Sequence, residues 1–373
     1  MRGAVMVLMA IDHVRVYSGL PAGGPTVGIF FTRWVTHFCA PAFAFFAGTS
    51  AFLHGRHPED AGARHGALAR YLASRGLVLL LLELTVIRVA WTFNLDFAHY
   101  ILAGVIWMLG WCLILLAAVV RLPVAALAAI GALIVGAHNL VDPAVPRLVA
   151  AAQQSPMGWL GQVLYFGPSW PSDGPFVVLY SLVPWIGVVM LGYAFGGVMA
   201  MDPTRARRWC YLLGVGAVAA FLVLRATRIY GDPRPWNGED ILSFLNTTKY
   251  PASLQFLLMT LGPTIALLPW ANGGQRSTTV LAVFGRVPLF YYLLHIPAIH
   301  LAAVLVSFAR EGQINAWLFA NHPMRNPPPP AGYTWSLLLL YGVFIATIAV
   351  LYPVCRWFAG IKATNRSWWV RYL

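Results

Sequence analysis

Apolar stretches long enough to cross a lipid bilayer recur along the whole of this chain, and they constrain its fold more than any other feature. A membrane-spanning helix needs about 20 mostly apolar residues, and by that measure about ten such stretches are present. They lie near residues 1–20, 30–53, 74–92, 99–119, 123–140, 176–199, 209–227, 251–270, 283–308 and 334–354. Hydrophobic residues make up 59% of the 373, and charged residues only 10%, which is too apolar for a soluble globular domain. We therefore expect an all-α polytopic membrane protein with about ten transmembrane helices.

Arginine and lysine residues in the short connections predict how the chain is inserted. Basic residues are retained on the cytosolic side, and here they concentrate after every second predicted span. They are Arg56, Arg64, Arg70, Arg75, Arg121, Arg205, Arg207, Arg208, Arg276, Arg356, Lys362, Arg366 and Arg371. This pattern predicts that both termini are cytosolic. The net charge of +13 is then explained by topology and attraction to anionic membrane lipids, without a nucleic-acid partner.

The remaining loops and the cysteines indicate how the chain is organised. Loops 141–175, 228–250 and 309–333 hold fewer basic residues for their length, so we expect them to face outward and to be partly folded. No repeat or linker divides the sequence, and residues 1–373 are expected to form a single transmembrane domain. The four cysteines show no CxxC spacing and none lies in these loops, so we expect thiols, with no disulfide and no metal site. The first apolar stretch lacks a small-residue cleavage site and is expected to remain as a helix.

An ionisable side chain at membrane depth is costly unless it lines a cavity or finds a partner, so such residues mark candidate sites. Arg2 and His13 share one face of the first predicted helix to within about 20°, and lie roughly 16 Å apart along it. Arg2 would lie at the cytosolic mouth and His13 near the middle of the bilayer. The spacing leaves open that Arg2 is a topology anchor and His13 a packing residue. Asp12 lies about 100° from His13, and is expected to tune the local field or to pair with Arg15.

Polar residues also interrupt the second and ninth predicted spans. Arg33 and His37 are four residues apart, which predicts a second polar stripe on one helix face. The same spacing is equally consistent with a structural role for both residues. Arg33 would then anchor the helix at the membrane interface, and His37 would form a hydrogen bond between helices. In the ninth span Tyr291 precedes His295 by four residues, so the two rings are expected to stack.

The third predicted span contains one acidic and one basic residue, Glu83 and Arg88. They lie about 140° apart around a helix, so neither easily satisfies the other. Each is expected to find a partner elsewhere, with Asp12 and Arg15 as candidates. A structural role is favoured over direct chemistry for both.

Several motifs occur together in this sequence. Arg2-Gly3 opens an apolar helix with His13 eleven residues after the arginine, followed by the run Thr36-His37-Phe38-Cys39-Ala40-Pro41 and by the segment from Gly285 to Pro297. These motifs resemble those of the bacterial relatives of heparan-α-glucosaminide N-acetyltransferase. The resemblance covers nearly the whole chain. More distantly, the chain is similar to the acyltransferase-three family of transmembrane acyltransferases.

The resemblance implies an enzyme of the bacterial cytoplasmic membrane. Such an enzyme passes an acyl group, often acetyl from cytosolic acetyl-CoA, to a hydroxyl or amine of a glycan on the far side, and depends on a buried histidine. Acyl-CoA is then a donor substrate and no cofactor is bound permanently. By this resemblance the catalytic histidine of the family would lie in the first outer loop. In this chain, however, residues 19–29 contain no histidine. His13, His37 and His295 are therefore all candidates for the catalytic residue.

This resemblance assigns further roles. Arg2 and Arg286, together with Arg276, would hold the phosphates of the donor by charge-assisted hydrogen bonds. His13 would act as general base towards the acceptor, since an imidazole has a pKa near the working pH. His37 or His295 would orient it.

Two other classes of function would also place arginine or histidine residues within the membrane. A secondary transporter or flippase for a small anion or a lipid-linked sugar also places arginine and histidine at membrane depth. A membrane cytochrome would use paired histidines as haem ligands. Transport would move a substrate without consuming an acyl donor, and a cytochrome would show a Soret band.

Overall fold

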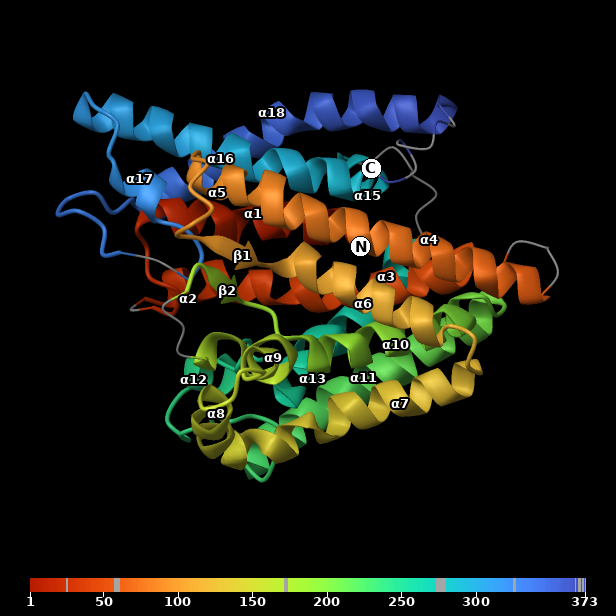
Figure 1. The fold of residues 1–373 in the computed structure, drawn as a ribbon. Helices are drawn as coiled ribbons and strands as arrows, with labels where there is room; N and C mark the ends of the chain where they lie inside the picture. Colours follow the sequence, from red (N-terminus) through yellow and green to blue (C-terminus); the bar gives the residue numbers. More distant parts are fainter. Residues whose placement is uncertain are drawn as a thin grey trace. The chain divides into compact units, whose positions relative to one another are not determined.

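The computed structural model describes residues 1–24, 26–56, 61–170, 174–272, 280–324, 327–365, 367, 370 and 372. Within these ranges the chain is mostly helical, with two short strands (Figure 1), which agrees with an all-α membrane protein. Its contacts divide into two compact units. Unit 1 comprises residues 1–39, 85–96 and 274–373, and unit 2 comprises residues 40–84 and 97–273. The prediction of a single domain stays a prediction.

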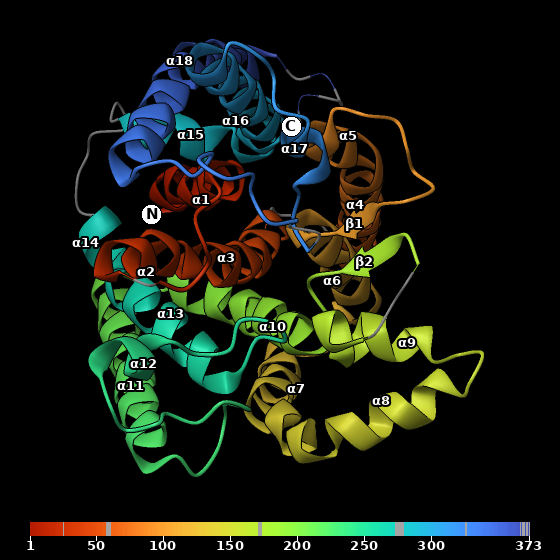
Figure 2. The same cartoon turned by 90° about the vertical axis from the view of Figure 1, so that its left-hand side faces the viewer.

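Unit 1 is built from helices that are far apart in the sequence. They are α1 (Arg2–Ser18), α2 (Val27–Trp34), the 3₁₀ helix η1 (Val35–Phe38), α5 (Arg88–Thr92), α15 (Val280–Arg286), α16 (Pro288–Glu311), α17 (Trp317–Ala320) and α18 (Leu337–Thr364). Helix α1 packs against α15, α16 and α18, as Figure 2 shows from the end of the bundle. This packing buries one face of α1 and brings residues from the two ends of the chain together.

Unit 2 contains the other helices. They are α3 (Cys39–His54), α4 (Ala61–Leu82), α6 (Val105–Val119), α7 (Val124–Ala137), α8 (Val145–Gln153), α9 (Trp159–Gly161), α10 (Leu182–Met199), α11 (Pro203–Thr227), α12 (Ile241–Leu245), α13 (Leu254–Ala266) and α14 (Leu268–Asn272). Short 3₁₀ and π segments join them, namely η2 (Glu83–Ile87, which runs into unit 1), η3 (His138–Ala144), η4 (Gln162–Phe166) and η5 (Gly167–Ser169). The main helix pairs are α4 with α6, α7 with α10, and α11 with α13.

Glycines allow two helices of unit 2 to touch through their backbones. A Cβ added to Gly192 of α10 would lie 2.1 Å from the carbonyl oxygen of Phe45 in α3, and one added to Gly48 would lie 2.0 Å from that of Val189. The Thr49 hydroxyl donates a hydrogen bond to the Gly192 carbonyl at 2.9 Å. Small residues and a hydroxyl bond at such a contact are the usual means by which helices associate in a membrane.

A short parallel sheet was missed from the sequence. The predicted spans 99–119 and 176–199 begin with strands β1 (Ile101–Ala103) and β2 (Phe176–Val178), which pair with Ile101 opposite Phe176. Valine, isoleucine and phenylalanine favour strands as strongly as they favour an apolar helix, so hydropathy does not separate the two. The helices α6 and α10 therefore start later than predicted, after Gly104 and Ser181.

Each of the ten predicted spans contains helical residues, but fewer helices meet a strict length and hydropathy criterion. Among the described residues, six helices are long and apolar enough to cross a membrane: Val27–His54, Val124–Gln153, Leu182–Met199, Pro203–Thr227, Pro288–Glu311 and Leu337–Thr364. Helices α6 and α13 are apolar but shorter, and α1 has 17 residues. The chain is thus an integral membrane protein. Of the basic residues used to predict topology, Arg276, Arg366, Arg371 and the side chain of Arg64 lie outside the described part.

Candidate functional site

Two of the predicted histidines meet in unit 1, although 282 residues separate them in the sequence. His13 of α1 and His295 of α16 face each other, with 2.7 Å between His13 Nδ1 and His295 Nε2. Their rings are stacked at a centroid distance of 4.8 Å. Both helices are apolar and pack side by side, and His295 is fully buried. Of the two histidines expected to orient His13, His295 is thus the one that contacts it through a hydrogen bond.

The backbone of α16 determines which nitrogen of each ring carries a proton. His295 Nδ1 lies 2.7 Å from the carbonyl oxygen of Tyr292 and 3.2 Å from that of Tyr291. A carbonyl only accepts, so His295 Nδ1 carries the hydrogen and its Nε2 has a lone pair. The bond between the rings then requires His13 Nδ1 to donate. In the neutral pair, the remaining lone pair of His13 is on Nε2, as a general base needs.

Aromatic rings enclose this histidine pair. Tyr291 stacks on His295 at 5.1 Å and 11° between planes, as the four-residue spacing predicted. The ring of Trp91 in α5 packs edge-on against His13 at 4.9 Å, and Tyr17 donates from its hydroxyl to the Trp91 carbonyl at 2.8 Å. Trp91 was not identified from the sequence, because its approach to α1 depends on packing between distant helices. These rings help to bury His295 fully, whereas His13 keeps partial exposure.

The polar residue beside His13 has a structural partner. Asp12 accepts a hydrogen bond from Arg15 Nε at 2.7 Å, the pairing expected from the sequence, and Arg15 Nη1 donates to the Leu20 carbonyl at 3.1 Å. This ion pair anchors the C-terminal end of α1.

The predicted stripe of Arg33 and His37 needs correction. His37 is buried at 2% exposure, but it lies in the 3₁₀ helix η1, whereas Arg33 belongs to α2. A 3₁₀ turn advances about 120° per residue rather than 100°, so His37 does not stand directly above Arg33. The element η1 packs against α1, and the Cys39 thiol just after it contacts the Val5 carbonyl.

Glu83 and Arg88 are each buried among groups of their own unit. The Glu83 carboxyl group, in unit 2, is buried against the start of α6, where a Cβ added to Gly104 would lie 2.1 Å from Glu83 Oε1.

In unit 1, the Arg88 guanidinium donates to the Thr92 hydroxyl and to the Asn94 side chain, and it also contacts the carbonyls of Asn94 and Asp96. It thereby closes the turn after α5. Asp12 and Arg15, the candidate partners named from the sequence, pair with each other.

The two predicted donor-binding arginines lie at the same end of unit 1. Arg2 and Arg286 are both exposed, and α1 begins where α15 ends. A Cβ added to Gly3 would lie 1.7 Å from the Leu281 carbonyl oxygen, and one added to Gly285 would lie 3.8 Å from Arg2 Cβ. The glycine after Arg2 is therefore required by the contact with α15. Arg276, the third arginine of this prediction, lies outside the described residues.

Replacing Gly3 by alanine is expected to destabilise unit 1, because the new methyl group would meet the backbone of α15. Overpacking of this kind costs about 1–3 kcal/mol. The matched control is Gly216→Ala in α11, where an added Cβ meets nothing within 4 Å. Thermal unfolding in detergent should show a lower midpoint for Gly3→Ala alone. Equal midpoints for the two variants would contradict the contact.

Comparison with known proteins places this chain in a family. The family model described as heparan-alpha-glucosaminide N-acetyltransferase, catalytic, matches residues 1–228, which include His13 but not His295. No curated protein matches the chain. Among the described residues, no group of three or more His, Cys, Asp or Glu side chains could hold a metal ion.

Proposed function

Because the chain belongs to the family of heparan-alpha-glucosaminide N-acetyltransferase catalytic domains, which are membrane transferases, we propose that it transfers an acyl group across the membrane. The donor is acyl-CoA, with acetyl-CoA as the expected form, and it binds from the cytosol. The acceptor is a hydroxyl or amine of an extracytoplasmic glycan or related molecule. The observation that carries this proposal is the contact between His13 and the fully buried His295, whose hydrogen bonds fix a lone pair on His13 Nε2.

In the proposed reaction, His13 Nε2 takes the proton of the acceptor hydroxyl or amine as that group attacks the thioester carbonyl carbon. The new bond forms between the acceptor oxygen or nitrogen and the acyl carbon. The carbon–sulfur bond then breaks, and the CoA sulfur leaves with the proton held by His13. His295 stabilises the transient imidazolium, because its Nε2 accepts from His13 Nδ1 while its own Nδ1–H remains bonded to the Tyr292 carbonyl.

Arg2 and Arg286 hold the nucleotide end of the donor in this proposal. The phosphates of CoA cannot enter lipid, whereas the pantetheine arm is thin enough to reach inward. Helix α1 runs without interruption from Arg2 to Ser18, so His13 lies roughly 16 Å along the axis from Arg2. Phosphate binding and proton transfer are therefore assigned to separate residues.

Changing Arg2 to alanine is expected to weaken acyl-CoA binding by about tenfold or more, the usual effect of losing a charge-assisted hydrogen bond. The rate of the bound complex should change much less, because phosphate binding is largely uniform between ground and transition states. Calorimetric titration of the purified protein with acyl-CoA measures the first quantity and saturating kinetics the second. Arg121→Ala, at an exposed turn between α6 and α7, is the control. Unchanged donor affinity in Arg2→Ala would remove this residue from the site.

The proposal also requires ten spans with both termini in the cytosol of a bacterial inner membrane. A fluorescent protein fused after Leu373 is then expected to fluoresce in bacteria, because Arg356 and Lys362 near that end favour the cytosol. Fluorescence of intact cells measures this. An alkaline phosphatase fusion at the same position is the complementary reporter, and phosphatase activity without fluorescence would reverse the topology.

Purified protein in sealed vesicles separates transfer from transport. With labelled acetyl-CoA outside and candidate acceptors inside, a transferase consumes the donor, releases one CoA per acyl group moved and yields labelled acceptor. A transporter or flippase would move substrate with the acetyl-CoA intact, and that result would overturn the proposed function.

A further inference from the structure

Helix α11 of unit 2 leaves one long face exposed. Its buried residues recur along the other side of the helix and are Ala206, Cys210, Gly214, Phe221 and Arg225. That side faces α13, because a Cβ added to Gly214 would lie 2.5 Å from the Ala266 backbone nitrogen. At about 100° per residue, the opposite side carries Arg208, Leu212, Val215, Ala219 and Leu222. All five are exposed, and we call them the α11 stripe.

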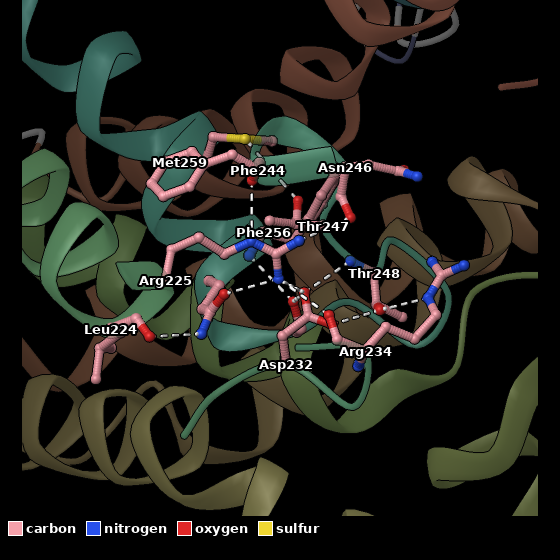
Figure 3. Close-up of polar contacts among 12 residues, drawn as sticks. Leu224, Arg225, Asp232, Arg234, Phe244, Asn246, Thr247, Thr248, Phe256 and Met259 are labelled. Carbon is pink, nitrogen blue, oxygen red and sulfur yellow. Dashed lines mark hydrogen bonds and ion pairs between the residues drawn. The ribbon is translucent and has the colours of Figure 1, made fainter. Parts of the chain in front are cut away.

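The length of α11 places its charged residues at the two surfaces of a membrane. No charged residue lies between Arg208 and Arg225, and the distance between them along a helix is about 26 Å. The hydrocarbon core of a bilayer is about 30 Å thick. Figure 3 shows how the Arg225 end is held. Its guanidinium donates to the carbonyls of Phe244 at 2.9 Å and Asn246 at 3.2 Å, and lies 3.8 Å from the Asp232 carboxylate. Arg208 then lies at the depth of the headgroups on the other surface.

The first residues of α11 carry a net positive charge. Asp202 caps the helix, since its carboxylate accepts from the backbone of Thr204 at 3.1 Å and of Arg205 at 3.0 Å. The same carboxylate lies 3.3 Å from the Arg205 guanidinium. Arg207 and Arg208 are exposed as well, and within the described ranges no carboxylate forms an ion pair with either. Three arginines and one aspartate leave residues 202–208 with a net charge of +2.

An aromatic and apolar surface continues from these arginines towards the centre of the membrane. The Arg207 guanidinium lies over the Tyr211 ring at 5.7 Å from the centroid, and Tyr211 is 40% exposed. Tyrosine is enriched where lipid meets water. Leu212 and Val215 follow Arg208 by one and two turns on the same face, and they are 59% and 58% exposed. A phospholipid matches this order, because its phosphate would meet the guanidinium groups while an acyl chain covers the leucine and valine.

We propose that Arg207, Arg208 and the α11 stripe form a binding site for an anionic phospholipid in unit 2. Its negative headgroup is complementary to the net positive charge at the start of α11. A zwitterionic lipid offers the same acyl chains, but its own cationic group offsets the phosphate, so the site favours the anionic lipid. This inference is independent of acyl transfer, and its test measures no activity.

Thermal unfolding of the full chain in nanodiscs tests the site. Ligands that bind only the folded state raise the unfolding midpoint, so phosphatidylglycerol in place of part of the phosphatidylcholine should raise it by about a few degrees. The double variant Arg207→Gln/Arg208→Gln should lose most of this rise, because each arginine near the surface strengthens binding of anionic lipid about fivefold. Both side chains are exposed, so the variant is expected to fold. No rise in the wild type would overturn the proposal.

The matched control is the double variant Arg70→Gln/Arg121→Gln. It removes the same charge from exposed positions in α4 and in the turn between α6 and α7, which are predicted to lie on the same side of the membrane. This variant should keep the rise. An equal loss in both double variants would show diffuse attraction to surface charge and would overturn a site on α11.

Two further measurements identify the occupant. Glycerol phosphate, which has no acyl chains, should leave the midpoint unchanged, and a rise equal to that with phosphatidylglycerol would refute a lipid site. In native mass spectrometry, the wild type and the control should retain phosphatidylglycerol that Arg207→Gln/Arg208→Gln loses. A dimer that forms without phosphatidylglycerol and dissociates in Leu212→Asn would show that a second copy of the chain covers the α11 stripe, and this would also refute the proposal.

Discussion

Replacing His13 by alanine is expected to lower the rate of acyl transfer by about 10²–10⁴-fold, the usual effect of losing a general base. Acyl-CoA affinity should stay nearly unchanged, because His13 is three helical turns from Arg2 at the donor end of α1. Steady-state kinetics and equilibrium titration with acyl-CoA give the two quantities. Arg2→Ala is expected to show the opposite combination, with weaker acyl-CoA binding and little change in the rate of the bound complex.

His54→Ala is the matched control for this change, since His54 is an exposed histidine at the end of α3. It should retain wild-type kinetics. Full activity in His13→Ala, combined with loss of activity in His37→Ala or His295→Ala, would show that another histidine is the base.

Two substitutions of His295 are expected to separate its hydrogen bond from its packing. In His295→Gln the side-chain oxygen can take the place of Nε2 and accept from His13 Nδ1, whereas the shorter side chain of His295→Asn cannot reach. We expect kcat to fall by about 10²-fold in the asparagine variant, the effect of misplacing a catalytic group by about 1 Å. The glutamine variant should recover much of this loss.

The Michaelis constants of the two His295 variants check the positioning role. Because His295 does not contact the donor phosphates in the proposed reaction, KM for acyl-CoA should remain the same in both variants while kcat differs. Equal kcat values for the glutamine and asparagine variants would mean that His295 acts only by filling space.

Short-range features of the site follow directly from helical periodicity. The 17 residues of α1 form one helix, so the shared face of Arg2 and His13 is a property of spacing alone. The same holds for the stacking of Tyr291 on His295 and for the Asp12–Arg15 pair, whose partners are within one turn. Regular α-helix makes such relations predictable from sequence.

Long-range features depend on packing that periodicity does not encode. The sequence proposed either His37 or His295 as the residue that orients His13, and the structure shows the contact with His295. Trp91 carries no polar signal and was missed for the same reason. The stripe of Arg33 and His37 failed because a local 3₁₀ segment replaced the α-helix, and hydropathy alone did not distinguish the strand β1 from the start of a helix.

Labelled acyl-CoA incubated with the purified protein in the absence of any acceptor tests the central claim, that His13 is a base within a ternary complex. The account predicts that CoA is released only after an acceptor is added, since the acyl group passes directly from thioester to acceptor. Rapid quenching measures CoA release, and mass spectrometry of the α1 peptide detects any acylated histidine. A burst of CoA roughly equal to the amount of enzyme, with label on His13, would contradict the account and establish an acyl-enzyme route instead.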